Sequence, residues 1–237
     1  MKKILLSLPQ VEWSCFLASY LQNILQIYYA TPVDFDLLEK NSIDEITFPY
    51  IGGKNQIVNY CEIQKSYDLV VDLDPDPLFS KFLNNKYGNV ESIQNCLYNS
   101  GEISIWESVA NHFSVPFLEP KFSIKIKNKT RKNRSISGVA IKNNNLRSYV
   151  KNAFFIEDNR LWHVPVRQNL IKRYDECNTV ESIVTDDIFC ALSGFAMNKD
   201  VIFLRLNECT PNIHIKDKIH IQDIGDFINA AHTKEAN

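Results

Sequence analysis

The stretch that decides the fold is SYDLVVDL, Ser66–Leu73, in the first half of the chain. An unbroken apolar run, Leu69–Val71, lies between two aspartates, and two prolines follow, Pro75 and Pro77. A short apolar run bounded by turn residues predicts a strand that is buried on both faces. Strands of this kind are typical of parallel sheets that helices cover on both sides.

The residues before this strand alternate between strand and helix patterns. Lys3–Leu8 (KILLSL) is an apolar run closed by Pro9, and Val11–Gln26 carries apolar residues at helical spacing. We also predict a strand at Ile27–Ala30, a helix at Asp34–Lys40 and a short strand at Glu45–Pro49. Because parallel strands need crossover helices, this order predicts a parallel α/β sheet.

The sharpest change in composition lies at residues 121–134 (KFSIKIKNKTRKNR), which carry seven Lys or Arg and no acid. This run follows a predicted helix, Ser104–Phe113, and overlaps a predicted edge strand, Phe122–Ile126. Its second half predicts a hinge, with an N-terminal lobe over residues 1–127 and a C-terminal lobe over residues 128–237. Since Phe122 is the one aromatic residue of the run, a groove for single-stranded nucleic acid is not expected.

The second lobe again mixes strands with helices. A helix is predicted at residues 187–197, between buried strands at Ile183–Thr185 and Val201–Leu206. Ile213–Ile221 (IHIKDKIHI) alternates strictly, which predicts an edge strand or a surface hairpin. The other predicted elements are strands at Ile136–Lys142, Ala153–Ile156 and Arg160–Val166 and a terminal helix at Asp223–Ala231. The predicted fold class is α/β, with two small Rossmann-like lobes on parallel sheets and a reduced second lobe.

The bulk composition is that of an ordinary globular protein. Of the 237 residues, 45% are hydrophobic and 23% charged, and the net charge of −2 provides no global field that attracts nucleic acid. The six cysteines form no C-x-x-C pair and no cluster with histidine, which disfavours a zinc site and favours buried, reduced thiols. No stretch reaches the roughly 18 apolar residues that a membrane helix needs. We therefore expect a cytoplasmic protein.

Three common catalytic signatures are missing from the sequence. It contains no G-x-G-x-x-G, no G-x-x-x-x-G-K-[ST] and no G-x-S-x-G. These absences disfavour a dinucleotide oxidoreductase, a P-loop enzyme and a hydrolase with a nucleophile elbow.

Acidic residues follow the first clearly buried strand. Asp72, Asp74 and Asp76 lie at its carboxyl end, where open α/β sheets bind ligands. Either two of these carboxylates converge on a cation, or the segment is an Asp- and Pro-rich turn that leaves the sheet. The sequence leaves both readings open.

Two further strand ends carry candidate residues. After the first strand, Glu12 is a candidate base and Trp13 a candidate sugar-stacking ring; alternatively they are a first-turn acid and a packing aromatic. After the strand at Ile183–Thr185 come Asp186 and Asp187. We predict Asp186 as the N-cap of the following helix and Asp187 as an acid in its first turn.

Four collinear segments resemble the heptosyltransferases, bacterial glycosyltransferases of GT-B fold that use ADP-heptose to build the lipopolysaccharide core. The segments are KKILLSLPQVEWSCFLASYL (Lys2–Leu21), YDLVVDL (Tyr67–Leu73), SIWESVANHFSVPFLEPKFSI (Ser104–Ile124) and VTDDIFCALSGFAMNKDVIFL (Val184–Leu204). The resemblance implies transfer of a sugar from an ADP- or UDP-linked donor to a bacterial surface glycan or protein acceptor. It implies no metal and no other cofactor. No nucleic-acid partner is expected, and peripheral membrane association and a protein partner stay open.

The resemblance also assigns candidate site residues. Pro9-Gln10 stand where the family has Gly-Asp, so Glu12 becomes the candidate catalytic base. Asp187 matches an aspartate of the family, but Ile188-Phe189 replace its Ser-Gly and would crowd the approach of donor phosphates to the helix start. The substrate-binding candidates are Gln10, Trp13, Asp72, Asp186, Asp187 and Thr210.

Three functions remain open at this point. The first is a working glycosyltransferase, and the second is a relative of this fold that has lost catalysis and serves as a binding or scaffolding protein. The third is a phosphatase resembling the haloacid dehalogenases, with Asp72 as nucleophile, Asp74 as acid/base, and Asp186 and Asp187 holding magnesium.

Overall fold

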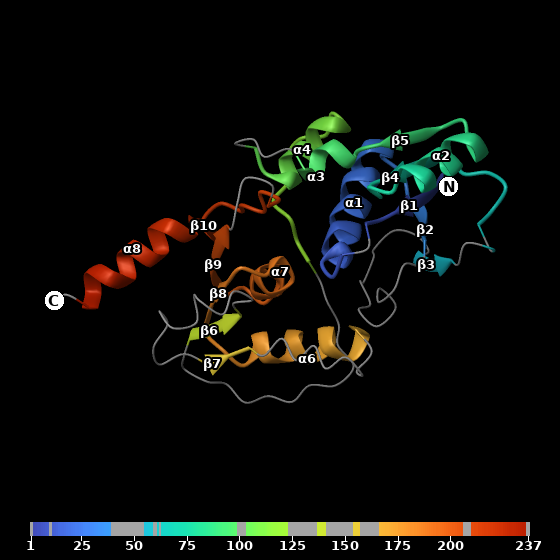
Figure 1. Ribbon diagram of the computed structural model, residues 1–237. Helices are drawn as coiled ribbons and strands as arrows, with labels where there is room; N and C mark the ends of the chain where they lie inside the picture. The colour runs from blue at the N-terminus through green and yellow to red at the C-terminus, as the bar shows by residue number, and fades with distance from the viewer. Residues whose placement is uncertain are drawn as a thin grey trace. The chain divides into compact units, whose positions relative to one another are not determined.

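The computed structural model describes residues 2–9, 11–38, 55–58, 61, 63–98, 103–122, 137–140, 154–156, 166–205 and 210–235. Contacts divide the chain into two compact units, Met1–Lys125 and Ile126–Asn237 (Figure 1). The residues around this division lie outside the described ones, so the boundary expected after residue 127 stays a prediction. No helix within the described ranges is long and apolar enough to cross a membrane.

The first unit is built on a parallel sheet with the strand order β3-β2-β1-β4-β5. The strands are β1 (Lys2–Ser7), β2 (Val33–Leu38), β3 (Asn55–Val58), β4 (Leu69–Asp72) and β5 (Val90–Ser92). The helices are α1 (Ser14–Tyr29), α2 (Pro77–Lys86), α3 (Gln94–Tyr98) and α4 (Ile105–His112). The strand order changes direction between β1 and β4, which creates a topological switch point there.

Helices cover both faces of this sheet. The connections β1-α1-β2 and β4-α2-β5 run in opposite directions from the switch point, so right-handed crossovers put α1 and α2 on opposite faces. On the α2 face, Leu5 and Val70 pack with Leu83 in one buried cluster. On the other face, the hydroxyl of Tyr20 in α1 donates a hydrogen bond of 2.8 Å to the carbonyl of Trp106 in α4. The buried strand predicted within Ser66–Leu73 is therefore confirmed as β4.

The strand predicted at Ile27–Ala30 is wrong. Helix α1 continues through Tyr29 and ends at Ala30, which has a left-handed conformation (φ 51°) and donates its N–H to the carbonyl of Ile27 at 3.1 Å. A left-handed residue after the last turn is a common way for a helix to end. Because Ala30 is not a glycine, the sequence contains no clear signal for this end.

The helix predicted at Asp34–Lys40 is also wrong, since Val33–Leu38 forms β2. Asp36 makes the segment look amphipathic, but its side chain is buried within the sheet. Its carboxylate accepts a hydrogen bond of 2.7 Å from the Tyr67 hydroxyl and lies 3.4 Å from Lys3 Nζ. These partners are distant in sequence, so only the tertiary structure explains an acid at this position.

Helix α2 was not predicted from the sequence. The Asp76 carboxylate accepts a hydrogen bond of 2.9 Å from the N–H of Leu78, and Pro77 is the first helical residue. An aspartate cap followed by proline is a typical helix start, so the signal was present in the segment for which we considered a cation site or a turn. The predicted strand Glu45–Pro49 and most of Phe122–Ile126 lie outside the described residues.

The second unit has its own parallel sheet, with the strand order β10-β9-β8-β6-β7. The strands are β6 (Ser137–Ala140), β7 (Phe154–Phe155), β8 (Ser182–Thr185), β9 (Asp200–Arg205) and β10 (Ile219–Asp223). The helices are α6 (Val166–Asn178), α7 (Ile188–Ala196) and α8 (Ile224–Glu235). The switch point of this sheet lies between β6 and β8.

Most predictions for the second unit are confirmed. Elements β6, β7, β8, α7, β9 and α8 lie where strands and helices were predicted, with shifts of a few residues at their ends. The alternating segment Ile213–Ile221 ends in β10, an edge strand of the sheet. Helix α6 was not predicted; Val166, the last residue of the predicted strand Arg160–Val166, is its first residue. The rest of that predicted strand lies outside the described residues.

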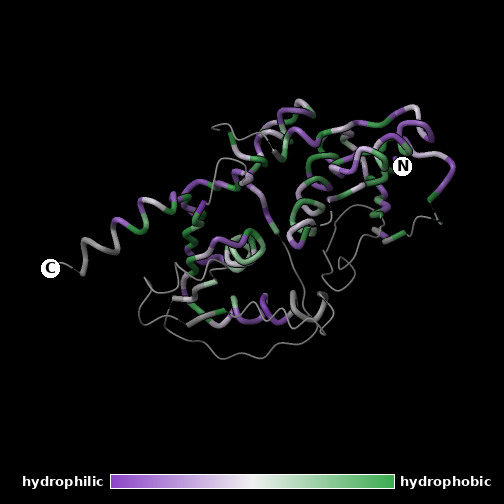
Figure 2. The backbone as a smooth tube through the Cα atoms, in the orientation of Figure 1, coloured by the Kyte–Doolittle hydropathy of each residue, from purple (hydrophilic) through white to green (hydrophobic). Residues whose placement is uncertain are grey.

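Helix α7 packs closely on the second sheet. It contacts β8 and β9 and is mainly hydrophobic (Figure 2). Its Gly194 allows this approach, because a Cβ atom there would lie 2.8 Å from Ile183 Cδ1 and 2.8 Å from Val201 Cγ2. A β-branched neighbour such as Val201 has little rotamer freedom with which to move aside.

Replacement of Gly194 by Ala is therefore expected to lower the free energy of unfolding by about 1–3 kcal/mol, through overpacking. Gly225→Ala is the matched control, because Gly225 is also helical and no heavy atom lies within 4 Å of its added Cβ. Alanine there should be neutral or stabilise by up to about 1 kcal/mol. Urea denaturation of both variants measures the difference, and equal stabilities would show that the packing argument is wrong.

Candidate functional site

Ligands of open α/β sheets bind beyond the carboxyl ends of the strands at the switch point. In the first unit these are the ends of β1 and β4. Glu12 and Trp13 follow β1, and Asp72 is the last residue of β4. In the second unit β8 ends just before Asp186 and Asp187. Thr210 lies elsewhere, half-buried in the connection between β9 and β10, and Gln10 lies outside the described residues.

The loop from β1 to α1 holds the predicted base. Glu12 is half-buried, whereas the ring of Trp13 is only 8% exposed and offers little surface for stacking on a sugar. Trp13 occupies the N-cap position of α1 without a side-chain capping bond. The Ser14 hydroxyl instead donates to the carbonyl of Pro9, which ties the loop to the helix start. Glu12 thus stays the candidate base of this loop.

Cys15, in the first turn of α1, is not a candidate nucleophile. A thiol near a helix N-terminus often has a lowered pKa, but this side chain is buried. Burial raises the pKa of the Cys15 thiol to about 12, an effect that hydrogen bonds from nearby backbone amides only partly oppose. Thiolate chemistry at Cys15 is therefore not expected at neutral pH.

This pKa has two measurable consequences. Iodoacetamide at pH 8 should modify the exposed Cys61 in the folded protein and leave Cys15 unmodified, as read by mass spectrometry of the peptides. Above the ordinary thiol pKa of about 8.5 the unfolded chain releases the Cys15 proton while the folded chain keeps it, so stability falls as pH rises towards 12. Cys15→Ala should reduce this loss of stability at alkaline pH. Equal labelling of Cys15 and Cys61 would refute the conclusion that the Cys15 thiol is buried with a raised pKa.

Asp72 belongs to a buried network on the α2 face of the first sheet. Its side chain is fully buried and accepts hydrogen bonds from Ser80 Oγ at 2.6 Å, Gln94 Nε2 at 3.3 Å and the N–H of Asp74 at 3.1 Å. Because α1 lies on the opposite face, Asp72 is not directed toward the loop that carries Glu12. An enclosed carboxylate that already accepts three hydrogen bonds is poorly suited to be the nucleophile of a phosphatase. Among the described residues, no group of three metal-ligating side chains could hold a metal ion.

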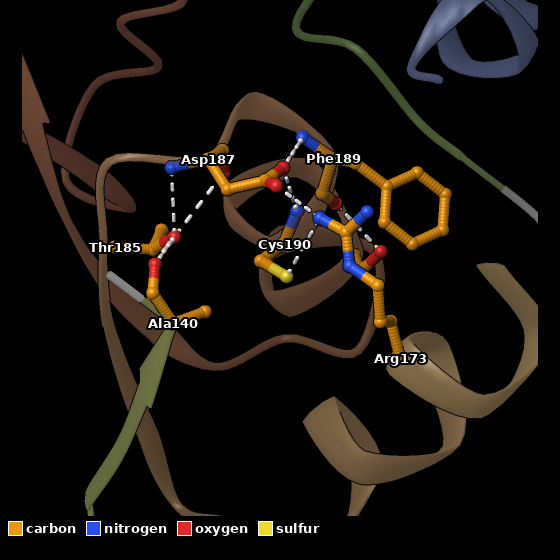
Figure 3. Close-up of polar contacts among 7 residues, drawn as sticks. Ala140, Arg173, Thr185, Asp187, Phe189 and Cys190 are labelled. Carbon is orange, nitrogen blue, oxygen red and sulfur yellow. Dashed lines mark hydrogen bonds and ion pairs between the residues drawn. The ribbon is translucent and has the colours of Figure 1, made fainter. Parts of the chain in front are cut away.

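The start of α7 differs from the prediction by one residue. Asp187, not Asp186, is the N-cap; its Oδ1 accepts hydrogen bonds from the N–H groups of Phe189 at 2.8 Å and Cys190 at 3.3 Å (Figure 3). Asp186 precedes it and is buried. The backbone at Asp187 is extended, as an N-cap requires, and an acid there also interacts favourably with the helix dipole.

Arg173 of α6 completes this site. Its guanidinium forms an ion pair with Asp187 Oδ2, lies 3.6 Å from Cys190 Sγ and stacks 5.2 Å above the Phe189 ring. Arg173 is 1% exposed and Asp187 is 3% exposed, so the pair is withdrawn from water. A hydrogen bond with Cys177 and burial raise the pKa of the Cys190 thiol well above its usual value, which keeps it neutral beside the pair.

Strand ends position the acid of this pair. The N–H of Asp187 donates to Thr185 Oγ1 at 2.9 Å, and that hydroxyl donates to the carbonyl of Ala140 at 2.6 Å. Ala140 ends β6 and Thr185 ends β8, so Asp187 is anchored at the switch point (Figure 3). Asp187 was predicted as a site residue and Arg173 was not. Helix α6 was not predicted, and Arg173 lies 14 residues before Asp187, a separation that carries no local signal.

Of the comparisons with known proteins, the one with solved structures bears on the fold. No protein-family model and no curated protein matches the sequence. Among solved structures, a family 9 glycosyltransferase from Veillonella parvula is similar at 9% identity with a TM-score of 0.62, over 99% of this chain and 89% of that chain. ADP-heptose lipopolysaccharide heptosyltransferase II from E. coli is similar at 11% identity with a TM-score of 0.52, over 100% of both chains. The resemblance to the heptosyltransferases is thus confirmed at the level of the fold, which is α/β with parallel sheets.

Proposed function

We propose that this protein is a divergent relative of the heptosyltransferases that binds an ADP- or UDP-linked sugar and transfers the sugar to a glycan or protein acceptor. The observation that carries the proposal is a parallel sheet with a topological switch point in each unit, with acidic residues at both switch points. The likeness in fold to two glycosyltransferases supports it. Because one of them is named for ADP-heptose, this sugar nucleotide is the first donor to test.

In this proposal Glu12 is the general base. It removes the proton from the acceptor hydroxyl while that oxygen attacks the anomeric carbon and the nucleoside diphosphate leaves. Glu12 is the one acid between β1 and α1, and its half-buried side chain is reachable from solvent. The N-terminus of α1, which has no side-chain capping bond, adds a partial positive charge close to the same loop.

The test combines binding with transfer. Calorimetric titration with ADP-heptose and other ADP- and UDP-sugars is expected to show binding, and Glu12→Gln should keep that binding while lowering the transfer rate about a hundredfold. Glu119→Gln, which changes an exposed glutamate of the same unit, is the matched control and should leave both unchanged. Absence of binding for every sugar nucleotide would refute the proposal.

A second candidate is a binding or scaffolding protein without catalysis. One observation favours it: the amides at the start of α7 and the Arg173 guanidinium are already used by the carboxylate of Asp187. If this candidate holds, a sugar nucleotide binds without turnover, or does not bind at all, and Glu12→Gln changes nothing. Transfer activity that depends on Glu12 would exclude it.

A further inference from the structure

Two buried cysteines meet where helices α6 and α7 pack together. Cys177, in the last turn of α6, and Cys190, in the first turn of α7, are each 0% exposed and carry free thiols. The two thiols form a hydrogen bond with each other. The position of Arg173 agrees with this geometry, because Arg173 lies one turn before Cys177 on the same face of α6 and approaches Cys190 Sγ at 3.6 Å.

This pairing differs from the surroundings of the buried and half-buried cysteines in the first unit. Cys15 and Cys96 donate to main-chain carbonyls, that of Glu12 at 3.8 Å and that of Ser108 at 3.7 Å. A thiol beside a carbonyl has only a weak hydrogen bond, whereas a thiol beside a second thiol can also join it in a disulfide. The contact between α6 and α7 therefore has a possible covalent chemistry that the other cysteine sites lack.

Two cations lie next to the pair. The guanidinium of Arg173 approaches Cys190, and Lys199 Nζ donates a hydrogen bond of 2.9 Å to the carbonyl of Asn178, the residue after Cys177. Positive charge favours the thiolate, which is the form that attacks a disulfide. The hydrogen bond with Cys177 and burial have the opposite and larger effect, and raise the pKa of Cys190 well above its usual value. The pair should therefore react when the α6–α7 junction opens.

We infer that Cys177 and Cys190 are a redox-active pair, which a small disulfide such as oxidised glutathione converts into an intramolecular disulfide between α6 and α7. In the first step the thiolate of one cysteine attacks the small disulfide, and one glutathione thiolate leaves. The second cysteine, also as a thiolate, then attacks the protein-side sulfur of the mixed disulfide, and the second glutathione thiolate leaves. The two cysteine protons end on the two glutathiones, so the protein dithiol loses two electrons and oxidised glutathione gains them. The new bond fixes α6 to the helix start that carries Asp187.

The test uses the full chain with Cys61→Ser, because Cys61 is exposed and would form disulfides between molecules. The protein is equilibrated with reduced and oxidised glutathione, quenched in acid and cleaved after Glu181 by a glutamyl endopeptidase. This cut is needed because no Lys or Arg lies between Cys177 and Cys190, so trypsin leaves both cysteines in one peptide. Mass spectrometry is expected to find the two peptides joined, and dithiothreitol should separate them.

The decisive quantity is the difference between the folded and the unfolded protein, because two cysteines this close in sequence also form a disulfide in the unfolded chain. A fold that holds the two sulfurs together favours the bond. At one glutathione ratio, the ratio of oxidised to reduced protein should be at least about tenfold higher in buffer than in concentrated urea. Samples that start reduced and samples that start oxidised should reach the same value, which shows that equilibrium was reached.

A ratio in buffer equal to or lower than that in urea overturns the inference, because the fold then does not favour the bond. A mixed disulfide with glutathione that persists on either cysteine of the folded protein overturns it too, since the second thiol is then out of reach. Cys190→Ser is the matched control, because its hydroxyl can still form a hydrogen bond with Cys177 but cannot form a disulfide. If Cys177 of this variant is linked to another cysteine of the chain at the same yield, the pairing with Cys190 is not specific and the inference fails.

Discussion

Arg173→Met is expected to lower the free energy of unfolding by about 3–5 kcal/mol, because it leaves the carboxylate of Asp187 buried without its counter-ion. Asp187 is 3% exposed, so water cannot replace the guanidinium without opening the junction between α6 and α7. Methionine preserves much of the apolar stem, which limits the loss of packing. Urea denaturation followed by circular dichroism measures the change.

The neighbouring lysine provides the control for this prediction. Lys172 is also in α6, and its side chain is 50% exposed beside Glu176, at an Nζ–Oε1 distance of 3.6 Å. Surface pairs of this kind contribute about 0.3–0.5 kcal/mol, so Lys172→Met should change stability only slightly. If Arg173→Met and Lys172→Met lower the free energy of unfolding by equal amounts, the buried pair of Arg173 and Asp187 does not have the structural role that we assign to it.

Trp106→Ala is the other substitution that we expect to lower the free energy of unfolding by about 3–5 kcal/mol. The side chain of Trp106 is fully buried, and its ring lies 5.2 Å from the ring of Tyr20 and 5.4 Å from that of Phe122. Alanine would leave a large cavity where α4 packs on α1, and the Tyr20 hydrogen bond to the main-chain carbonyl could not hold that contact alone.

Phe117→Ala is the matched control for the cavity argument, because Phe117 follows the same helix but is 46% exposed. Its truncation should alter the free energy of unfolding by no more than about 0.5 kcal/mol. Urea denaturation of the two variants under identical conditions measures their free energies of unfolding. A loss in Trp106→Ala close to that in Phe117→Ala would show that the α1–α4 contact contributes little.

The strands and helices that the sequence predicted well share one property: their burial follows directly from their own residues. Leu69–Val71 and Ile183–Val184 are apolar runs with turn residues or acids at their ends, and both form strands at a switch point. The small and apolar residues after Asp187 predict α7 for the same reason. Local composition was sufficient here because most residues of these segments are buried.

The failures have a different physical origin. β2 contains Asp36, which is tolerated in a buried strand only because Lys3 and Tyr67 reach it from other elements. Helix α6 has a weak apolar pattern, so its register cannot be recognised before its partners are known. In both cases the stabilising contact joins residues that are far apart in the chain.

The candidate site shows the same division. The sequence alone determined that two parallel α/β units carry acids at strand ends, since hydrophobic runs and helix-start residues are local properties. Only the tertiary structure decided what the acids do: it encloses Asp72 among Ser80 and Gln94, and it pairs Asp187 with Arg173. A carboxylate's role depends on which donors surround it and on how far water is excluded, and folding sets both.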